Sequence, residues 1–334
     1  METIDMIYLL YNRSLYAAAA ALLVAFAGTA VAVDDRHQIV SSDGAVIESA
    51  ASGAIHGVSG SAGYRPIGVR RDVEAEFPAS RLTPDEMAEM ARTYVPIVPP
   101  YASAEAARET VIGSDARYRI LPKASGYPER AIGLLIFNQG DSSFICTGWL
   151  INANTVATAG HCVHQGNGGS FSSNVVFYPG RDAASSPFGS CSARTLFTVN
   201  GWATDGNEQF DYGAVKLNCN VGNTTGWFGF FSQTASLVGL PVQVSGYPGD
   251  KPFGTQWSGS GDVQISEARK TRYMIDTAGG QSGGPVFETD RVGDFCGGPC
   301  ANTIHTYGLS NGRNSGTRID EAVFNNLIAW INAP

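Results

Sequence analysis

Short apolar runs separated by turn residues fill most of the chain between residues 111 and 318, which predicts many short β-strands. Glycine and proline mark the turns, as in Tyr247-Pro248-Gly249-Asp250. This pattern favours a β-barrel or a β-sandwich over a helical fold. The expected strands are Ala131–Phe137, Thr155–Ala159, Val175–Tyr178, Ala214–Leu217, Val242–Val244, Tyr273–Ile275 and Pro285–Phe287.

Two segments instead show helical spacing of apolar residues. The first follows a capping box with proline at the first helical position, Thr83-Pro84-Asp85-Glu86, and places Met87, Met90 and Tyr94 on one face. The second closes the chain over residues 319–332, and its apolar stripe should pack against a barrel. That stripe comprises Ile319, Val323, Phe324, Leu327, Ile328 and Ile331.

The N-terminal pattern predicts export. Arg13 precedes the apolar run Leu15–Ala27, and the small residues after it end in Ala30-Val31-Ala32, an A-x-A cleavage site. The alternative is a membrane anchor, but the whole apolar stretch is alanine-rich, about 18 residues long at most and ends in small residues, so cleavage is favoured over a span. We therefore expect a signal peptide over residues 1–32 and a secreted, extracellular protein that leaves the membrane.

Residues 33–110 contain no cysteine and look loosely structured apart from the helix after Thr83. This zone could be a small independent domain, but its place between a signal peptide and the strand-rich region predicts a propeptide. The net charge of the chain is −8 and no basic stripe is present, so no nucleic-acid partner is expected.

All six cysteines lie beyond residue 145. An even number of cysteines after a signal peptide indicates disulfides formed in an oxidising compartment. The cysteines are Cys146, Cys162, Cys191, Cys219, Cys296 and Cys300.

The first motif with chemical meaning is Gly279-Gly280-Gln281-Ser282-Gly283-Gly284-Pro285. A serine hydroxyl needs a neighbouring base to act as a nucleophile, and glycines allow backbone N–H groups to converge on one point. The N–H groups of Gly280 and Ser282 are the expected oxyanion donors. Taken alone, the motif fits a glycine-rich turn equally well.

The second motif is Thr158-Ala159-Gly160-His161-Cys162. Histidine suits the base because its ordinary pKa of about 6.5 lies near operating pH. A lone histidine is usually structural, but a disulfide from Cys162 to Cys146 would hold this loop and stabilise it by about 3 kcal/mol.

The third motif is Asp211, which opens an otherwise apolar strand through Leu217 and would orient the imidazole of His161. His161, Asp211 and Ser282 occur in the order found in chymotrypsin-like enzymes. They predict the catalytic triad of a serine endopeptidase that acts through an acyl-enzyme. A protease-fold binding protein without activity is the alternative, but such proteins usually lack a triad member.

The chain resembles the bacterial glutamyl endopeptidases, a branch of the trypsin-like serine peptidases, over nearly all of residues 111–332. The resembling stretches are Val111–Asp115, Cys146–Trp149, Thr155–Cys162, Asp211–Ala214, Ser245–Lys251, Gly254–Trp257, Gly279–Phe287 and Gly316–Ile319. The resemblance implies an all-β peptidase domain over residues 111–334, acting on proteins or peptides without a cofactor or metal. It also implies two antiparallel six-stranded Greek-key barrels, over about 111–225 and 226–318, followed by the helix at 319–332. An additional cysteine pair, Cys191 with Cys219, and Gly284 in place of a serine are departures from the family.

The resemblance also implies a substrate preference. In glutamyl endopeptidases, residues matching His305 and Thr277, with the mature N-terminal amine near Val111, bind a glutamate carboxylate. This favours cleavage after Glu, and more weakly after Asp. Asp276 lies where trypsin-like enzymes keep the aspartate that selects Arg or Lys, so cleavage after Arg or Lys is the alternative. Gln281 cannot form the ion pair that captures a new amine in trypsin-like zymogens, which leaves that amine free to serve the pocket.

The remaining cysteines follow from proximity and elimination. Cys296 and Cys300 enclose three residues, and a small disulfide loop fits better there than a zinc site, which needs four ligands. Cys191 is then left to pair with Cys219. Asn223 begins a glycosylation sequon, and we expect the protein to act as a monomer.

Overall fold

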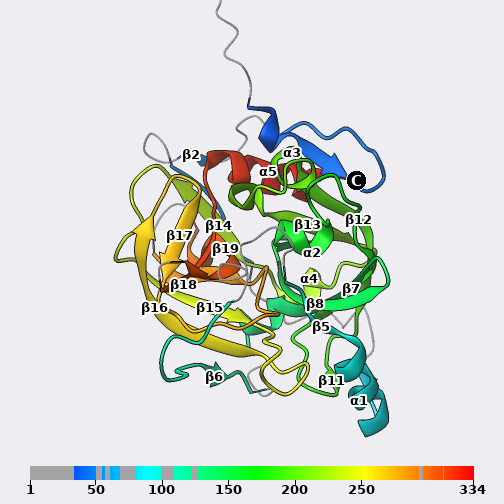
Figure 1. Ribbon diagram of the computed structural model, residues 1–334. Coiled ribbons are helices and arrows are strands. Elements are labelled where there is room, and N and C mark those ends of the chain that lie inside the picture. The colour runs from blue at the N-terminus through cyan, green and yellow to red at the C-terminus, as the bar shows by residue number, and fades with distance from the viewer. Residues whose placement is uncertain are drawn as a thin grey trace, which may run out of the picture. The chain divides into compact units, whose positions relative to one another are not determined.

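Six antiparallel strands close the first barrel, drawn mainly in green in Figure 1. Around the barrel the order is β12-β10-β7-β8-β9-β13, and pairing of β13 with β12 completes the circuit. The strands are β7 (Ile132–Gln139), β8 (Ser142–Leu150), β9 (Thr155–Thr158), β10 (Ser173–Pro179), β12 (Cys191–Val199) and β13 (Gly213–Leu217).

A second circuit of six antiparallel strands runs in the order β18-β15-β16-β17-β20-β19 and is closed by pairing of β19 with β18 (Figure 1). The two closed barrels confirm the architecture expected from the sequence. The strands are β15 (Pro241–Gly246), β16 (Trp257–Ser266), β17 (Lys270–Tyr273), β18 (Pro285–Arg291), β19 (Gly298–Ser310) and β20 (Arg313–Arg318).

The C-terminal helix α5 (Glu321–Asn332) begins after Asp320, whose side chain accepts the backbone N–H of Val323 as an N-cap. Of the predicted stripe, the helix buries Val323, Phe324 and Leu327, while Ile328 and Ile331 are only partly buried. It also buries Trp330, which the stripe did not include. Shorter helical turns are η1 (Asp35–His37), η3 (Glu129–Ala131), α2 (Gly160–Val163), α3 (Asn200–Ala203), η4 (Glu208–Phe210) and α4 (Gly222–Thr225).

The segment before residue 111 adds strands to both barrels. β1 (Ile39–Ser41) pairs with β12, β3 (Ser61–Tyr64) pairs with β14 (Gly229–Gln233), and β2 (Ile55–His56) pairs with β3. β14 itself runs parallel to β19. Further pairs join β4 (Ser80–Arg81) to β11 (Ser185–Ser186), β5 (Val95–Pro96) to β8, and β6 (Tyr118–Arg119) to β16. The expectation of a loosely structured zone is therefore wrong for β1 to β5, because strands of the peptidase region supply the hydrogen-bond partners that short strands lack by themselves.

The helix expected after Thr83 is α1 (Pro84–Thr93), and both hydrogen bonds of its capping box form between Thr83 and Glu86. Its sulfur-bearing face meets the first barrel, where Arg181 donates to the Sδ atoms of Met87 at 3.4 Å and Met90 at 3.6 Å. The amphipathic pattern thus marked a surface that docks on the barrel.

The computed structural model describes residues 34–49, 55–56, 61–67, 80–98, 109–121, 126–292, 296–310 and 312–334. The expected signal peptide lies outside these residues. No helix within the described ranges is long and apolar enough to cross a bilayer. Three disulfides join Cys146 to Cys162, Cys191 to Cys219 and Cys296 to Cys300, which is the pairing expected from the sequence.

Candidate active site

His161 and Asp211, the expected base and its orienting carboxylate, are in direct contact. His161 lies in α2 immediately after β9, and the disulfide from Cys162 to Cys146 ties this turn to β8. Asp211 accepts the backbone N–H of His161 at 2.8 Å through Oδ1, and its Oδ2 lies 2.7 Å from His161 Nδ1. The carboxylate therefore holds both the backbone and the ring of the histidine.

Asp211 stays ionised although it is completely buried. Burial opposes the charge, but the field of His161 and hydrogen bonds from His161 and Tyr307 hold the pKa of Asp211 below its ordinary value. The ionised carboxylate keeps the ring proton on Nδ1, so Nε2 is the nitrogen of His161 that lies on the side of the ring away from Asp211. Nε2 forms no hydrogen bond with any residue that the structure describes.

Ser282, the expected nucleophile, is held between the barrels. Its carbonyl oxygen accepts the N–H of Thr147 in β8 at 2.8 Å, and the next residue, Gly283, donates to the carbonyl of His305 in β19 at 2.7 Å. Gly283 must be glycine, since its φ is +84° and a Cβ would lie 2.2 Å from the carbonyl oxygen of Thr147. Gly280, the other expected oxyanion donor, lies in the same turn with φ of +100°.

The hydroxyl of Ser282 points to a partner that the sequence did not indicate. Ser282 Oγ donates to Oε1 of Glu109 at 2.5 Å. Glu109 is 7% exposed, and burial raises the pKa of its carboxyl to about 8 despite hydrogen bonds from Ser282 and the backbone of Gln281 and despite the field of Arg117. The carboxyl is therefore largely protonated at neutral pH.

His305 adjoins the same carboxyl group. Its Nε2 lies 3.4 Å from Glu109 Oε1, and its Nδ1 lies 2.6 Å from the hydroxyl of Tyr273. Burial and the field of His161 lower the pKa of His305 to about 3, so the contact with Glu109 joins two neutral groups and is not an ion pair. A phenol proton donated to Nδ1 leaves the ring proton on Nε2, the nitrogen that faces Glu109.

The expected pocket residues Thr277 and Val111 border this group through the backbone. Thr277 donates its N–H to the carbonyl of Thr110 at 3.3 Å, and Val111 follows Thr110 directly. The hydroxyl of Thr277 is buried and has no hydrogen-bond partner among the described residues. The structure thus brings Ser282, His305 and the segment before Val111 together.

Asp276 is occupied by other donors. Its Oδ1 accepts the N–H of Ile112 and its Oδ2 accepts the N–H of Ala116, each at 2.7 Å. Both carboxylate oxygens therefore hold the chain after Val111.

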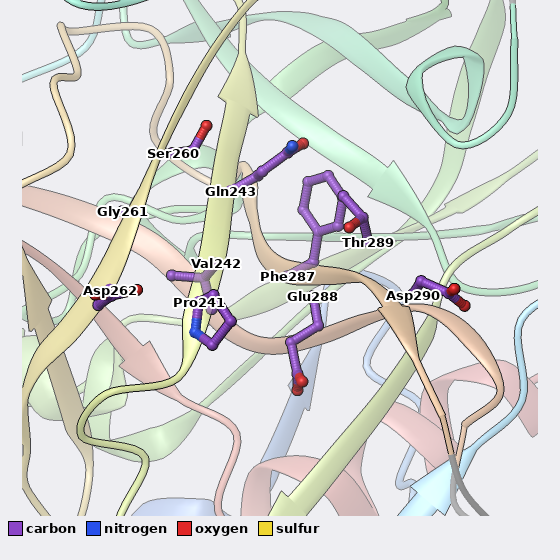
Figure 2. Close-up of a pocket in the computed structure, with 10 residues that line it drawn as sticks. All are labelled: Pro241, Val242, Gln243, Ser260, Gly261, Asp262, Phe287, Glu288, Thr289 and Asp290. Carbon is purple, nitrogen blue, oxygen red and sulfur yellow. The ribbon is translucent and has the colours of Figure 1, made fainter.

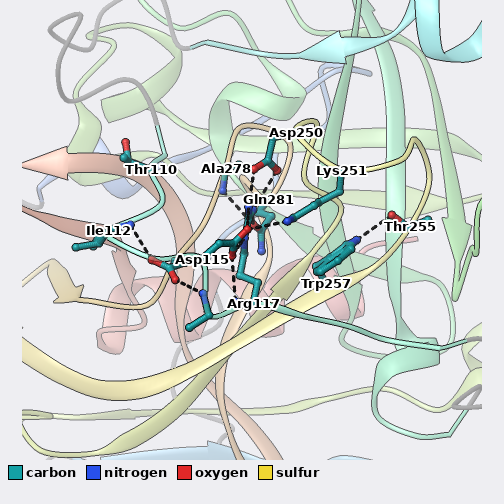
Figure 3. A network of polar contacts seen from close by, with 12 residues as sticks. Thr110, Ile112, Asp115, Arg117, Asp250, Lys251, Thr255, Trp257, Ala278 and Gln281 are labelled. Atoms are coloured by element: carbon teal, nitrogen blue, oxygen red, sulfur yellow. Dashed lines mark hydrogen bonds and ion pairs between the residues drawn. The ribbon is translucent and has the colours of Figure 1, made fainter.

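Arg117 joins this segment to the serine turn (Figure 3). Its guanidinium donates to Asp115, to Asp250 and, at 3.1 Å, to Oε1 of Gln281, which also accepts the N–H of Ala278. Burial alone would lower the pKa of Arg117, but the two carboxylates hold it above its ordinary value. Gln281, which lies beside Ser282, is thus fixed by an arginine. The sequence did not indicate Arg117, because no local motif contains it.

Replacing Arg117 with methionine should lower stability by about 1–3 kcal/mol and lower kcat by about 10- to 100-fold, because Gln281 loses its anchor and the serine turn shifts. Arg119→Met is the matched control, since Arg119 is more exposed and forms an ion pair with Asp182. It should cost less than about 1 kcal/mol. Urea unfolding and steady-state kinetics of both variants provide the measurements, and equal behaviour of the two variants would contradict the role of Arg117.

A separate hollow of about 450 Å³ lies on the second barrel, between β15, β16 and β18 (Figure 2). Its lining includes Asp262, Glu288 and Asp290, which would repel a substrate carboxylate. No member of the expected triad lines it. This hollow is therefore not a pocket for glutamate.

The comparisons with known proteins concern the family and the fold. A family model described as Trypsin matches residues 124–331. The chain is 45% identical to a glutamyl endopeptidase of Bacillus licheniformis over 75% of this chain and 76% of that protein. It is also 42% identical to a protein of Bacillus subtilis named extracellular metalloprotease, over 67% of this chain and 70% of that one.

Among solved structures, a Glu endopeptidase in complex with MPD is similar, with a TM-score of 0.56 and 31% identity, covering 66% of this chain and 97% of that one. The family match, the Bacillus relatives and the two closed barrels give the same answer. The chain belongs to the trypsin family and is a serine endopeptidase.

Proposed function

We propose that this protein is a secreted endopeptidase that cleaves after glutamate, and more weakly after aspartate, with His161, Asp211 and Ser282 as its triad. The observation that carries the specificity is the carboxyl of Glu109, buried against Ser282 and beside His305. A cavity that already holds one glutamate side chain in contact with the nucleophile has the size and donors for another. The names of the relatives from Bacillus licheniformis and among solved structures support the same specificity.

The proposed chemistry gives each member of the triad one role. His161 Nε2 takes the proton of Ser282 as Oγ attacks the peptide carbonyl, and the N–H groups of Gly280 and Ser282 stabilise the resulting oxyanion. The imidazolium then gives the proton to the leaving amine, and the C–N bond breaks to leave an acyl-enzyme. Water, deprotonated by His161, releases the acid in the same way, while Asp211 stabilises the imidazolium throughout.

A substrate carboxylate loses its hydrogen bonds to water when it enters the pocket, and donors in the pocket must replace them. Nε2 of His305 and the hydroxyl of Thr277 are available as donors, and the amine created near Val111 by processing adds positive charge. Asp276 does not compete, since the N–H groups of Ile112 and Ala116 occupy its oxygens. The same contacts argue against the trypsin-like alternative, in which Asp276 would have to face the substrate.

We infer that the chain is made as a precursor, with a signal peptide over residues 1–32 and a propeptide over 33–110, and that the mature enzyme begins between Glu109 and Val111. Strands β1, β3 and β5 would then belong to the propeptide and hold it on both barrels. The mature protein acts as a monomer on proteins or peptides, with no nucleic-acid or membrane partner.

The name of the Bacillus subtilis relative raises metal-dependent hydrolysis as a second mechanism. Within the described residues, the only group of three candidate ligands comprises Cys146, His161 and Cys162. The two sulfurs form a disulfide and therefore lack the thiolate charge that binds zinc, while Nδ1 of the histidine faces Asp211. This donor set does not fit a metal, and the serine mechanism is preferred.

The proposal predicts a strong preference between paired peptides that differ only in the residue before the scissile bond. The mature enzyme should cleave the Glu peptide at least about 100-fold faster than a Gln or Arg peptide. The buried donors of the pocket bind a carboxylate, and a Gln or Arg side chain would leave some of them without an acceptor. Values of kcat/KM for the three peptides provide the measurement. Faster cleavage of the Arg peptide would overturn the specificity and leave the triad untouched.

A further inference from the structure

The chain supplies its own occupant for the catalytic site. In chymotrypsin-like enzymes the serine hydroxyl is hydrogen-bonded to the histidine that removes its proton. Here Ser282 Oγ donates to Glu109 Oε1 at 2.5 Å, and Nε2 of His161 has no partner among the described residues. The nucleophile is thus turned from its base towards a carboxyl of the same chain.

Glu109 also fills the place where the substrate side chain would bind. Its carboxyl lies 3.4 Å from Nε2 of His305, the residue that we propose for glutamate recognition, and its side chain is 2% exposed. An incoming glutamate would meet an occupied pocket. One side chain therefore blocks both recognition of the substrate and attack upon it.

The backbone on the C-terminal side of Glu109 is firmly held. Asn314 in β20 donates to the carbonyl of Thr110 at 2.7 Å and accepts the N–H of Thr110 at 3.1 Å. Asp276 fixes Ile112 and Ala116 beyond it. Because the following residues are anchored, Glu109 is delivered into the site and its effective concentration there is high.

The contact does not lead to hydrolysis. Peptide cleavage requires an amide carbonyl beside Ser282 and an amine as leaving group, whereas the group found there is the side-chain carboxyl of Glu109. Attack on a carboxyl would have to expel hydroxide or oxide and would break no peptide bond. Glu109 therefore occupies the site as an inert ligand.

A second contact from the same N-terminal region covers the neighbouring backbone. β5 pairs in parallel with Phe144 and Ile145 of β8, directly before Cys146. Pro96 of β5 packs over the serine turn. A Cβ atom added to Gly279 in that turn would lie only 2.9 Å from the Cβ of Pro96. The region before residue 111 thus reaches the site from two directions.

We propose that the uncleaved chain is inhibited by Glu109, which occupies the glutamate pocket and holds the hydroxyl of Ser282 away from His161. The proposal rests on the proposed function, because it takes this pocket to be the substrate site. Cleavage after Glu109 would remove the blocking side chain, while Asn314 keeps Thr110 in place. The new amine of Thr110 would then lie at the border of the vacated pocket and add the positive charge that a substrate carboxylate needs.

The protonation of Glu109 gives the inhibition a pH dependence. The charged or titratable groups around it are His161, His305, Tyr273, Arg117 and Asp250. Docking raises the pKa of Glu109 from 4.5 to about 8, so the docked form binds more protons than the released form. Docking is therefore fully stabilised below about pH 4.5 and weakens as pH rises towards about 8. The amide of a Glu109→Gln variant does not ionise and would show no such loss.

The test uses diisopropyl fluorophosphate, a neutral reagent that phosphorylates a reactive serine hydroxyl with loss of fluoride. Second-order labelling rates are measured by intact mass on precursors verified to be uncleaved. The Glu109→Ala precursor should be labelled at least about 10-fold faster than wild type. The variant lacks the hydrogen bond between Ser282 and the neutral Glu109 carboxyl, and it lacks the side chain that covers Ser282. Glu89→Ala is the matched control and should leave the rate unchanged, because Glu89 is an exposed residue of α1.

The Glu109→Gln precursor preserves the packing and provides an independent comparison. The ratio of the wild-type to the Glu109→Gln labelling rate should rise between pH 5 and pH 9, because only the carboxyl ionises. Comparison at each pH removes the pH effects that both proteins share. A ratio that stays constant, or equal rates for wild type and Glu109→Ala, would overturn inhibition by Glu109.

The processed wild-type enzyme separates this proposal from the one on which it rests. Rapid labelling of Ser282 in both the processed enzyme and the wild-type precursor would refute the inhibition alone. A processed enzyme that cleaves the Glu peptide no faster than the Arg peptide would refute the glutamate pocket. Slow labelling of the wild-type precursor, with rapid labelling of the processed enzyme and of Glu109→Ala, is the result that we expect.

Discussion

Replacing Ser282 with alanine should lower kcat of the processed enzyme by about a million-fold and leave its fold intact. Among the described residues, the hydroxyl of Ser282 donates to Glu109 and to no strand of either barrel. Ser282 is held by the N–H of Thr147 on its carbonyl oxygen, a contact that alanine retains. Circular dichroism should therefore be unchanged while turnover disappears.

His161→Ala should have nearly the same effect as Ser282→Ala, and the double variant should be no worse than either, because the two groups act as one unit. His164→Asn is the matched control. His164 lies three residues away, and its Nδ1 accepts the N–H of Gly166 at 2.9 Å, a role that an asparagine oxygen can take over. The control should keep turnover within a few fold of wild type.

A purified Ser282→Ala enzyme with wild-type kinetics would remove Ser282 from the mechanism. A His164→Asn enzyme as inactive as His161→Ala would show that the assay reports damage to the fold near α2, and the assignment of His161 as the base would then lose its support.

Removing His305 should reduce kcat/KM for the Glu peptide by about 10- to 100-fold, because a hydrogen bond to a charged group contributes about 1.5–3 kcal/mol. Cleavage of the Gln peptide should fall much less, since a neutral amide depends less on that donor. The His305→Ala variant should thus lose selectivity in particular. Its stability should also be measured, since the ring packs beside Tyr273 in the core of the second barrel.

Asp276→Asn separates the two models of specificity. In our account Asp276 holds Ile112 and Ala116, so its replacement should change the Glu and Gln peptides in parallel and leave their ratio within a few fold. The trypsin-like model predicts instead that Arg cleavage depends on Asp276 and survives loss of His305. A selectivity ratio that responds to Asp276 and not to His305 would reverse our choice.

Much of the fold and of the expected site could be predicted from local patterns. Short apolar runs indicated the barrel strands, the box at Thr83 and Glu86 indicated α1, and the apolar stripe after Asp320 indicated α5. The residues around His161, Asp211 and Ser282 carry the resemblance to the family because each lies in a short, distinctive motif.

The contacts of the N-terminal segment could not be predicted in this way. β1 and β5 are three and two residues long, too short to show alternation, and their partners β12 and β8 are distant in the sequence. The bonds from Glu109 to Ser282 and from Arg117 to Gln281 each join residues that share no motif. The sequence around Glu109 does not indicate the pocket that this side chain enters. The sequence around Arg117 does not indicate that its guanidinium also reaches Asp250.

The most direct test of the central claim is to map the adduct of diisopropyl fluorophosphate on the processed enzyme. We expect one labelled residue, Ser282. Labelling of Ser282 and loss of Glu-peptide cleavage should proceed at the same rate. Neither event should be slowed by prior treatment with a metal chelator. Labelling at another serine, or full activity after stoichiometric labelling of Ser282, would contradict the claim that this serine is the nucleophile.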